Sequence, residues 1–235
     1  SAGVATYDFT VNIEGDALYE GNETFTITLS NISNASDGTL VHTVTIADNE
    51  TTPTIGFATD ATNGQEATTS KSFTIQLNAV SGVAATVSYA ATGGTATGSA
   101  NAGTDDYQTF TGQTLTISAG TTSNTFSFNV NNDLLDEVDE TIIYAISSPT
   151  NAALGVATQT YTIQDDDAEP SFGFAAATSV VDETEADLDH VVIAQLSAVS
   201  GKDVTFDYVV AGVSATGGGT DFLLSDGSGT VSAGA

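Results

Sequence analysis

The sequence of 235 residues contains no cysteine, methionine or tryptophan, and its only basic residues are Lys71 and Lys202. The absence of cysteine excludes disulfides and thiolate metal sites. With 30 acidic residues the formal charge is −28, which repels nucleic acid and anionic membranes and leaves almost no group to bind phosphate or carboxylate substrates. Metal cations are therefore the natural partners of this chain.

The sequence also lacks a long apolar run. No segment approaches the roughly 18 consecutive apolar residues of a membrane span, and no charged-then-apolar leader is present. We therefore expect neither membrane insertion nor a signal peptide in this segment, and any export signal or anchor to lie outside it. Hydrophobic residues make up 40% of the chain, which excludes a disordered acidic tail and supplies material for buried cores.

What the chain does contain is an internal repeat. SAGVATYDFTVNIEGDALYEGNETFTITLSN, from residue 1, aligns without a gap with SAGTTSNTFSFNVNNDLLDEVDETIIYAISS, from residue 118. The match continues from TVTIADNETTPTIGF to YTIQDDDAEPSFGF, which places Pro53 on Pro170, and SAG recurs at residue 232. Divided at the prolines, the chain consists of the back half of one unit, a complete unit and the front half of another: residues 1–52, 53–169 and 170–235.

Short segments of alternating apolar residues fill the complete unit. Phe73, Ile75 and Leu77 fall on one face of an extended chain, and clusters of Gly, Asn, Asp and Ser separate such segments. The expected strands are TIGFA, SFTIQL, ATVSYAA, QTLTI, TFSFNV, ETIIYAI and TQTYTI. This pattern indicates an all-β fold of tandem immunoglobulin-like, seven-stranded antiparallel β-sandwiches.

The acidic residues of the complete unit gather in three places. Asp106 lies in GTDDY, a second group lies in NNDLLDEVDET from residue 131, and Asp165, Asp166 and Asp167 end the last strand segment. In a sandwich, the turn before the sixth strand and the end of the seventh can meet at one end, and the loop holding Asp106 can join them. Such a convergence would cost on the order of several kcal/mol without a cation. Oxygen-only ligands suit Ca²⁺, which takes about six to eight of them.

The half units carry the same acidic positions. Random surface acids are not expected to follow a repeat so closely, although duplication of a common unit would also copy them. The front half contributes Asp221 in GTDFLLSD, which matches GTDDYQTF from residue 103. The positions in the back half are Asp16, Glu20, Glu23, Asp48, Asn49 and Glu50.

The combination of GTDDY, a strand followed by SAG, the spacing D-x-x-x-E-x-x-E before the next strand and the final I-x-DDD resembles the Calx-β repeat. That repeat occurs in sodium–calcium exchangers and in many giant bacterial surface proteins, and the resemblance extends over nearly the whole chain. It implies a seven-stranded sandwich with Ca²⁺ bound at one end.

The resemblance also implies a set of calcium ligands. An early-strand glutamate of the family falls near Glu66, or near Glu183 in the last unit, across an alignment that slips by two residues. Asp136 and Asp139 are interpreted as solvated surface or as residues that support the ligands from behind. The implied ligands of the complete unit are Asp106, Asp133, Glu137, Glu140, Asp165, Asp166 and Asp167.

Catalysis is not expected. His42 and His190 stand alone without repeated counterparts, which favours structural roles, and no GxSxG or Ser-His-Asp spacing is present. Paired carboxylates can cleave glycosides, but these acids lie beside an interdomain linker that has no aromatic residues to stack a sugar. The Gly-rich ATGGTATGSANAG, from residue 91, is predicted to be a flexible connection because no Lys or helix follows it.

The function that the sequence favours is structural. We expect a calcium-binding repeat of an extracellular or cell-surface fibre, stalk or filament, in which Ca²⁺ at the domain junctions stiffens the array. Its expected partners are calcium ions and neighbouring repeats, or copies of itself placed end to end so that the two half units complete one sandwich. An adhesin-type module that binds a carbohydrate or a surface receptor is the alternative.

Overall fold

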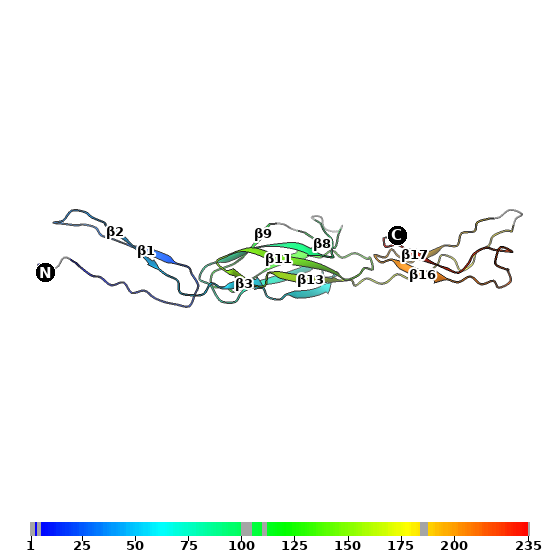
Figure 1. Ribbon diagram of the computed structural model, residues 1–235, viewed down its shortest axis with the longest axis horizontal. Helices are drawn as coiled ribbons and strands as arrows, with labels where there is room; N and C mark the ends of the chain where they lie inside the picture. The colour runs from blue at the N-terminus through cyan, green and yellow to red at the C-terminus, as the bar shows by residue number, and fades with distance from the viewer. Residues whose placement is uncertain (1–2, 4–5, 100–104, 110–111, 184–187, 235) are drawn as a thin grey trace.

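The computed structural model describes residues 3, 6–99, 105–109, 112–183 and 188–234. Its regular elements are all β-strands, and they form three parts that lie in a row (Figure 1). A hairpin from the N-terminal residues lies at one end, a sandwich from the middle of the chain follows, and paired strands from the C-terminal residues extend beyond it. Among the residues described, no helical segment has the length and hydropathy of a membrane span.

Two sheets build the central sandwich. One has the order β10 (Ser123–Asn129), β5 (Ser70–Leu77), β3 (Thr54–Phe57) and β12 (Ala153–Leu154). The other has the order β4 (Ala61–Gln65), β13 (Thr158–Gln164), β11 (Glu140–Thr150), β6 (Ala85–Gly94) and β9 (Gln113–Ile117). A short pair, β7 (Gly98–Ser99) and β8 (Tyr107–Gln108), lies beside them. The prediction of an all-β sandwich is confirmed, and each of the expected segments is a strand.

The core lies between these two sheets, where alternating side chains of both point inward. Phe73 and Phe128 stack with ring centroids 4.9 Å apart. Phe73 also packs in an edge-to-face arrangement against Tyr144 of the opposite sheet, with ring centroids 5.1 Å apart. All of these side chains are buried. Burial of each such side chain contributes about 1.5–3 kcal/mol, so the period-two pattern of the sequence accounts for the packing of the two sheets.

Two strands of the sandwich sheets, β4 and the short β12, were not predicted, and β4 is the one that bears on the acidic residues. The segment ATNGQ of β4 lacks apolar alternation, and it pairs in parallel with β13 in a sandwich whose other long strands are antiparallel. The buried amide of Gln159 helps to hold it, donating to the Thr59 hydroxyl at 3.1 Å and to the Thr62 hydroxyl at 3.0 Å. Because parallel strands end at the same edge of a sheet, the residues after β4 and after β13 meet.

The flanking parts are smaller. The N-terminal part is the hairpin of β1 (Glu23–Thr28) and β2 (Val41–Ile46), together with extended chain before it. The C-terminal part has two antiparallel pairs, β14 (Phe172–Phe174) with β15 (Ala194–Leu196), and β16 (Val204–Tyr208) with β17 (Gly227–Val231).

Both flanking parts leave apolar side chains exposed whose counterparts in the central sandwich are buried. Phe9 is 55% exposed, whereas Phe126, its counterpart in the gapless repeat, is 6% exposed. In the C-terminal part, Phe174 is 66% exposed, whereas the corresponding Phe57 is 3% exposed. Each flanking part thus presents half of a hydrophobic core.

Candidate metal centre

Acidic side chains from separate segments converge where β4 and β13 end. The backbone amide of Glu66 donates to the carbonyl of Gln164 at 3.1 Å, so Glu66 lies beside the start of the Asp165–Asp167 run. The loop before β11 crosses the same end of the sandwich and brings Asp133 and Glu137 to this place. Parallel pairing of strands that are distant in the sequence therefore assembles the cluster.

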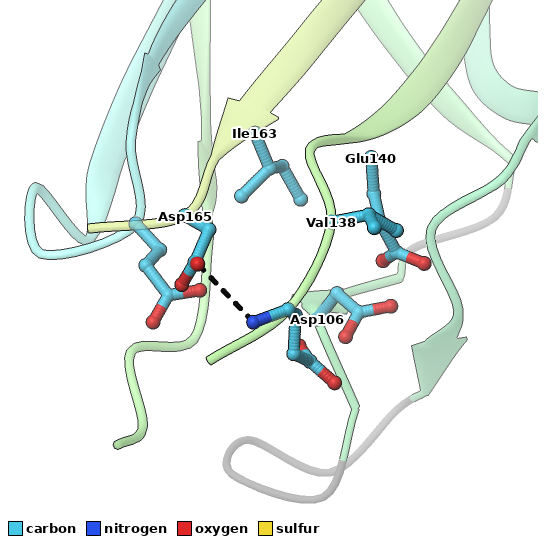
Figure 2. Close-up of a pocket in the computed structure, with 7 residues that line it drawn as sticks. Asp106, Val138, Glu140, Ile163 and Asp165 are labelled. Atoms are coloured by element: carbon cyan, nitrogen blue, oxygen red, sulfur yellow. Dashed lines mark hydrogen bonds between the residues drawn. The ribbon is translucent and has the colours of Figure 1, made fainter. Parts of the chain in front are cut away.

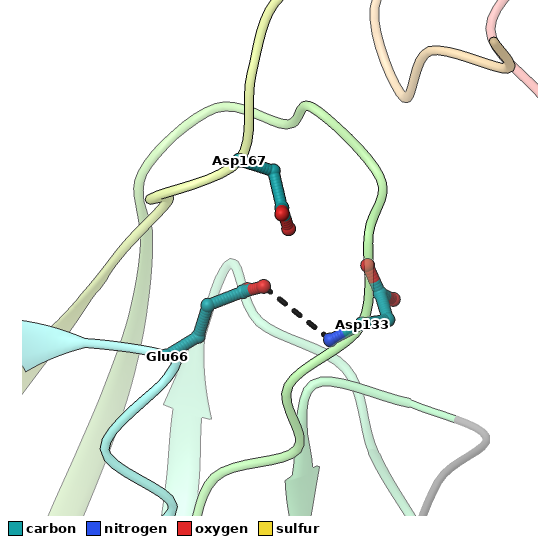
Figure 3. Close-up of side chains that lie close together, drawn as sticks. All are labelled: Glu66, Asp133 and Asp167. Atoms are coloured by element: carbon teal, nitrogen blue, oxygen red, sulfur yellow. Dashed lines mark hydrogen bonds between the residues drawn. The ribbon is translucent and has the colours of Figure 1, made fainter.

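The tightest group is formed by Glu66, Asp133 and Asp167, whose carboxylate oxygens lie within 4.8 Å of one another. Figure 3 shows the three side chains pointing toward a common centre. The amide of Asp133 donates to Glu66 Oε1 at 3.4 Å, and Glu66 is only 6% exposed. Among the described residues, the buried Oδ2 of Asp167 has no hydrogen-bond partner. Three carboxylate oxygens placed this close together could hold a cation.

A second group lines a small adjoining hollow. Asp106, Glu137, Glu140 and Asp165 surround it together with Glu66 (Figure 2). The amide of Glu137 donates to Asp165 Oδ2 at 3.1 Å, which fixes that carboxylate at the rim. Asp106 Oδ2 accepts from the Thr97 amide at 2.5 Å and from the Thr97 hydroxyl at 2.9 Å.

The electrostatics of both groups oppose ionisation. Burial, followed by interaction with the Asp167 side chain, raises the pKa of Glu66 to about 7. Burial and the hydrogen bond and charge of Asp106 raise the pKa of Glu140 to about 8. The pKa of Glu137 is also raised, first by burial and then by surrounding carboxylates. A divalent cation reverses this cost, and the all-oxygen donor set fits a hard ion such as Ca²⁺.

The neighbouring acids differ in their roles. Asp166 is exposed, and its Oδ1 accepts from the Ala67 amide at 3.3 Å, so it holds the loop after β4 at the edge of the cluster. Asp139 accepts from the amide of Asp165 at 3.2 Å and supports that residue from behind. Asp136 is 5% exposed, so for this residue the interpretation as solvated surface is wrong.

The N-terminal part reproduces the hydrogen bonds of the central one. Asp48 Oδ2 accepts from the Glu20 amide at 3.0 Å, and its Oδ1 accepts from the Glu50 amide at 3.0 Å. Asp165 accepts in the same way from the amides of Glu137 and Asp167, at 3.1 and 3.2 Å. The turn is therefore a property of the repeated sequence and not of one domain.

Charge in this N-terminal copy is distributed unevenly. Backbone donors, led by the Glu50 amide, lower the pKa of Asp48 to about 2. The pKa of Glu20 is raised mainly by the charge of Asp16, and that of Glu50 by its hydrogen bond to Asp48. Asp16 also accepts from the Leu18 amide at 2.8 Å, as Asp133 does from the Leu135 amide at 2.8 Å in the central copy. Asp48 therefore ionises more readily than the neighbouring carboxyls of Glu20 and Glu50.

The remaining predicted ligands lie apart from the central cluster. Glu23 opens β1 at the position that Glu140 has in β11. Asp221 Oδ2 accepts from the Thr216 amide at 2.6 Å, which lies five residues before it, whereas Asp106 accepts from Thr97, nine residues before it. Glu183 is exposed, and within the described chain it belongs to no group of three close ligand atoms.

The charged contact of Lys202 with this region was missed. Lys202 Nζ lies 2.7 Å from Asp136 Oδ1 and 4.0 Å from Asp165 Oδ2. The segment AVSG, which precedes Lys202 at residues 198–201 and recurs at 79–82, was the available signal. The sequence alone did not link AVSG to the acidic residues, because each AVSG segment lies in one unit and the acidic loop that it contacts lies in the preceding unit.

A search of protein families finds a match over almost the whole chain. The family model of the Calx-beta domain matches residues 1–50, 48–167 and 165–232. The chain belongs to the Calx-beta domain family. The resemblance predicted from the acidic motifs is thereby confirmed, and Calx-beta domains occur here in tandem.

Solved Calx-beta structures are also similar to the chain. The crystal structure of the apo-form Calx CBD1 domain has 24% identity and a TM-score of 0.44, and the match covers 50% of this chain and 100% of that one. The calcium binding domain CBD12 of CALX1.1 has 24% identity and a TM-score of 0.44, with 52% of this chain and 48% of that chain covered. The match thus covers about half of that CBD12 structure. A search of curated proteins finds no match.

Proposed function

We propose that this chain is a calcium-binding structural repeat in which each ion cluster lies at the junction of two Calx-beta domains. The observation that carries the proposal is the convergence of Glu66, Asp133 and Asp167 at the end of the central sandwich, with a buried Asp167 oxygen that accepts no hydrogen bond from the described residues.

The chemistry of the chain supports a hard cation. Its potential ligands are carboxylate and amide oxygens, with neither cysteine nor any repeated histidine. Asp165 helps to line the hollow and lies five residues before Pro170, where the next unit begins. Ions bound here would connect the end of one domain to its own loops and restrain the neighbouring domain. No group in the described cluster suggests catalysis.

Calorimetric titration with Ca²⁺ tests the proposal. We expect saturable binding by the full chain, and we expect Asp167→Asn to weaken it by at least about tenfold, because a unit charge near 4 Å contributes on the order of 4 kcal/mol at an intermediate dielectric. Asp60→Asn is the matched control, since Asp60 is exposed and precedes β4, whereas Glu66 follows it. Absence of binding heat, together with a thermal melt that chelator leaves unchanged, would refute a calcium role.

The flanking parts support an array that continues end to end. A hollow of about 310 Å³ in the N-terminal part is lined by Phe9, Ile27, Leu29 and neighbouring residues. The counterparts of these three in the central domain, Phe126, Tyr144 and Ile146, are core residues, so the hollow is an open half of a core. It therefore favours completion by a front half unit over an adhesin-type site for a sugar or receptor.

We propose that a neighbouring repeat of the fibre, or a second copy of the chain, supplies that front half. An extracellular or cell-surface location accords with this, because millimolar Ca²⁺ suits sites of the extracellular kind. Sedimentation velocity over a concentration series tests completion by copies: mass should grow above 23.7 kDa, and Phe9→Asp should prevent the growth. A constant mass at every concentration contradicts completion by copies.

A further inference from the structure

The two domain junctions share one backbone contact. At the first junction the Gly82 amide donates to the Tyr19 carbonyl at 2.9 Å, and at the second the Gly201 amide donates to the Asp136 carbonyl at 2.9 Å. Tyr19 and Asp136 occupy the same position in the gapless repeat. Each contact forms a parallel bridge between the acidic loop of one domain and a turn of the next, Tyr19 with Ser81 and Asp136 with Ser200.

The receiving turn is the repeated segment AVSG, at residues 79–82 and 198–201. Its serines, Ser81 and Ser200, are 1% and 2% exposed. Ser81 Oγ donates to the Tyr19 carbonyl at 3.0 Å. At the second junction Ser200 Oγ donates to Asp136 Oδ2 at 3.2 Å. A buried hydroxyl paired across the junction marks a built contact and not a chance one.

The SAG triplets hold this turn in place from within the receiving domain. The amide of Gly120 donates to the Ser81 carbonyl at 2.9 Å, and the amide of Gly234 donates to the Ser200 carbonyl at 2.8 Å. The recurrence of SAG next to each AVSG segment is thereby explained. The two motifs form one receiving surface in each domain.

The glycine of the turn leaves room for a predicted metal ligand. A Cβ atom at Gly82 would lie 2.5 Å from Glu20 Cγ, and one at Gly201 would lie 2.6 Å from Glu137 Cγ. Any larger residue must therefore displace the glutamate of the preceding acidic loop. The contact between domains and the position of the ligand are mechanically coupled.

The junctions differ in charge. The second one has Lys202 directly after AVSG, and its Nζ lies 2.7 Å from the nearly buried carboxylate of Asp136. At the first junction the corresponding positions are the uncharged Val83 and Tyr19. An internal cation therefore bridges one junction, and its counterpart is missing from the other.

We propose that AVSG is the docking site for the acidic loop of the preceding Calx-beta domain, and that Lys202 stiffens the second junction in the absence of calcium, while the first junction, which has the same backbone contact but no cation, depends on calcium for its stiffness. The part of this proposal that concerns calcium at the first junction rests on the proposed function. The part that concerns Lys202 does not, because the ion pair is formed by the protein alone.

Distances between spin labels in the full chain test the proposal, and the absence of native cysteine makes each introduced label unique. Thr125→Cys with Thr205→Cys spans the second junction, and Thr43→Cys with Thr125→Cys spans the first; all three sites are exposed strand positions. In chelator we expect a narrow distance distribution across the second junction and a broad one across the first. Addition of calcium should narrow the distance distribution across the first junction.

Lys202→Ala should broaden the distribution across the second junction in chelator, while the melt of the central sandwich stays unchanged. The double variant Tyr19→Asp with Val83→Lys introduces the same ion pair at the first junction. It should narrow the distance distribution across that junction in chelator. If Lys202→Ala leaves the second distribution unchanged, the proposal is overturned. Because these comparisons contain no calcium, they stand even if the calorimetric test of calcium binding fails.

Gly201→Ala separates docking from charge. This variant should broaden the distance distribution across the second junction and also weaken calcium binding, since the added methyl displaces Glu137. Gly173→Ala is the matched control in the same part of the chain, because a Cβ there meets no atom within 4 Å. An effect of Gly173→Ala equal to that of Gly201→Ala would contradict a specific docking role for AVSG.

Discussion

Glu66 and Glu140 are weaker acids than ordinary glutamates while no metal is bound. Their pKa values rise from the ordinary 4.5 to about 7 and about 8, in each case chiefly through burial. A pKa raised by folding means that the protonated group stabilises the folded state. That stabilisation is complete below about pH 4.5 and is lost as the pH rises through about 7 and 8.

We therefore expect the melting temperature of the metal-free protein to fall between about pH 5 and pH 9. Saturating Ca²⁺ should remove this fall, because the ion stabilises the ionised carboxylates. Thermal melts followed by circular dichroism over this pH range, in chelator and in saturating calcium, measure the fall in melting temperature and its removal. Glu140→Gln should reduce the fall in chelator, and a melting temperature that rises with pH in the metal-free protein would contradict the assignment.

Lys202 places a positive charge next to the candidate metal centre as well as across the junction. Its Nζ lies 4.0 Å from Asp165 Oδ2, and the lysine side chain is 39% exposed, so solvent screens much of its effect. Lys202→Ala should tighten calcium binding a few-fold by removing a competing cation and freeing Asp136. Calorimetry at low and high salt measures this change, with a smaller effect expected at high salt. Weaker binding by the variant would show that Lys202 assembles the site instead of competing for it.

The strands of the central sandwich and of the N-terminal part have matching sequences but different surroundings. We expect Phe126→Ala to destabilise the protein by about 3–5 kcal/mol, because it empties a position between two sheets. Phe9→Ala, at the aligned position, should cost less than about 1 kcal/mol in dilute solution, since Phe9 is 55% exposed. Urea unfolding of both variants measures the difference. Equal losses would mean that the N-terminal part is already covered in the free chain.

Strands with period-two patterns were predictable from sequence, and strands held by other forces were not. Phe73, Ile75 and Leu77 alternate with polar residues, so the face of β5 could be assigned directly. The segment of β4 has no such alternation, and its place depends on a parallel partner that lies far along the chain and on the amide of Gln159. Hydrogen bonding of this kind leaves no period in the sequence.

The candidate site shows the same division. The gathering of Asp133, Glu137 and Asp165 near one end followed from their repeated spacing before and after predicted strands. The burial of Asp136 could not be predicted from that spacing, since it depends on Ser200 and Lys202 of the following domain. Contacts within a unit were predictable from its own pattern, whereas contacts between units required the relative placement of two domains.

The molecule as a whole carries a formal charge of −28, and its three parts lie in a row (Figure 1). Self-repulsion of this size destabilises a compact state, and salt screens it over about 10 Å at 0.1 M ionic strength. Sodium chloride should therefore raise the melting temperature of the metal-free protein more than that of the calcium-loaded protein. Melts over a salt series test this, and an equal response in the two states would show that calcium does not neutralise the chain.

The parallel pair of β4 and β13 also sets the order in which the domain can fold. Gln159 reaches Thr59 across 100 residues of sequence, and β4 finds its partner only when β13 has been made. At a synthesis rate of about 5–20 residues per second, Glu66 waits several seconds for Asp167 to emerge from the ribosome. Such long-range pairing also slows folding. Under the proposed function, metal uptake at this end of the sandwich is therefore restricted to chains whose domain is finished, and it would report completion of the domain before it contributes stiffness.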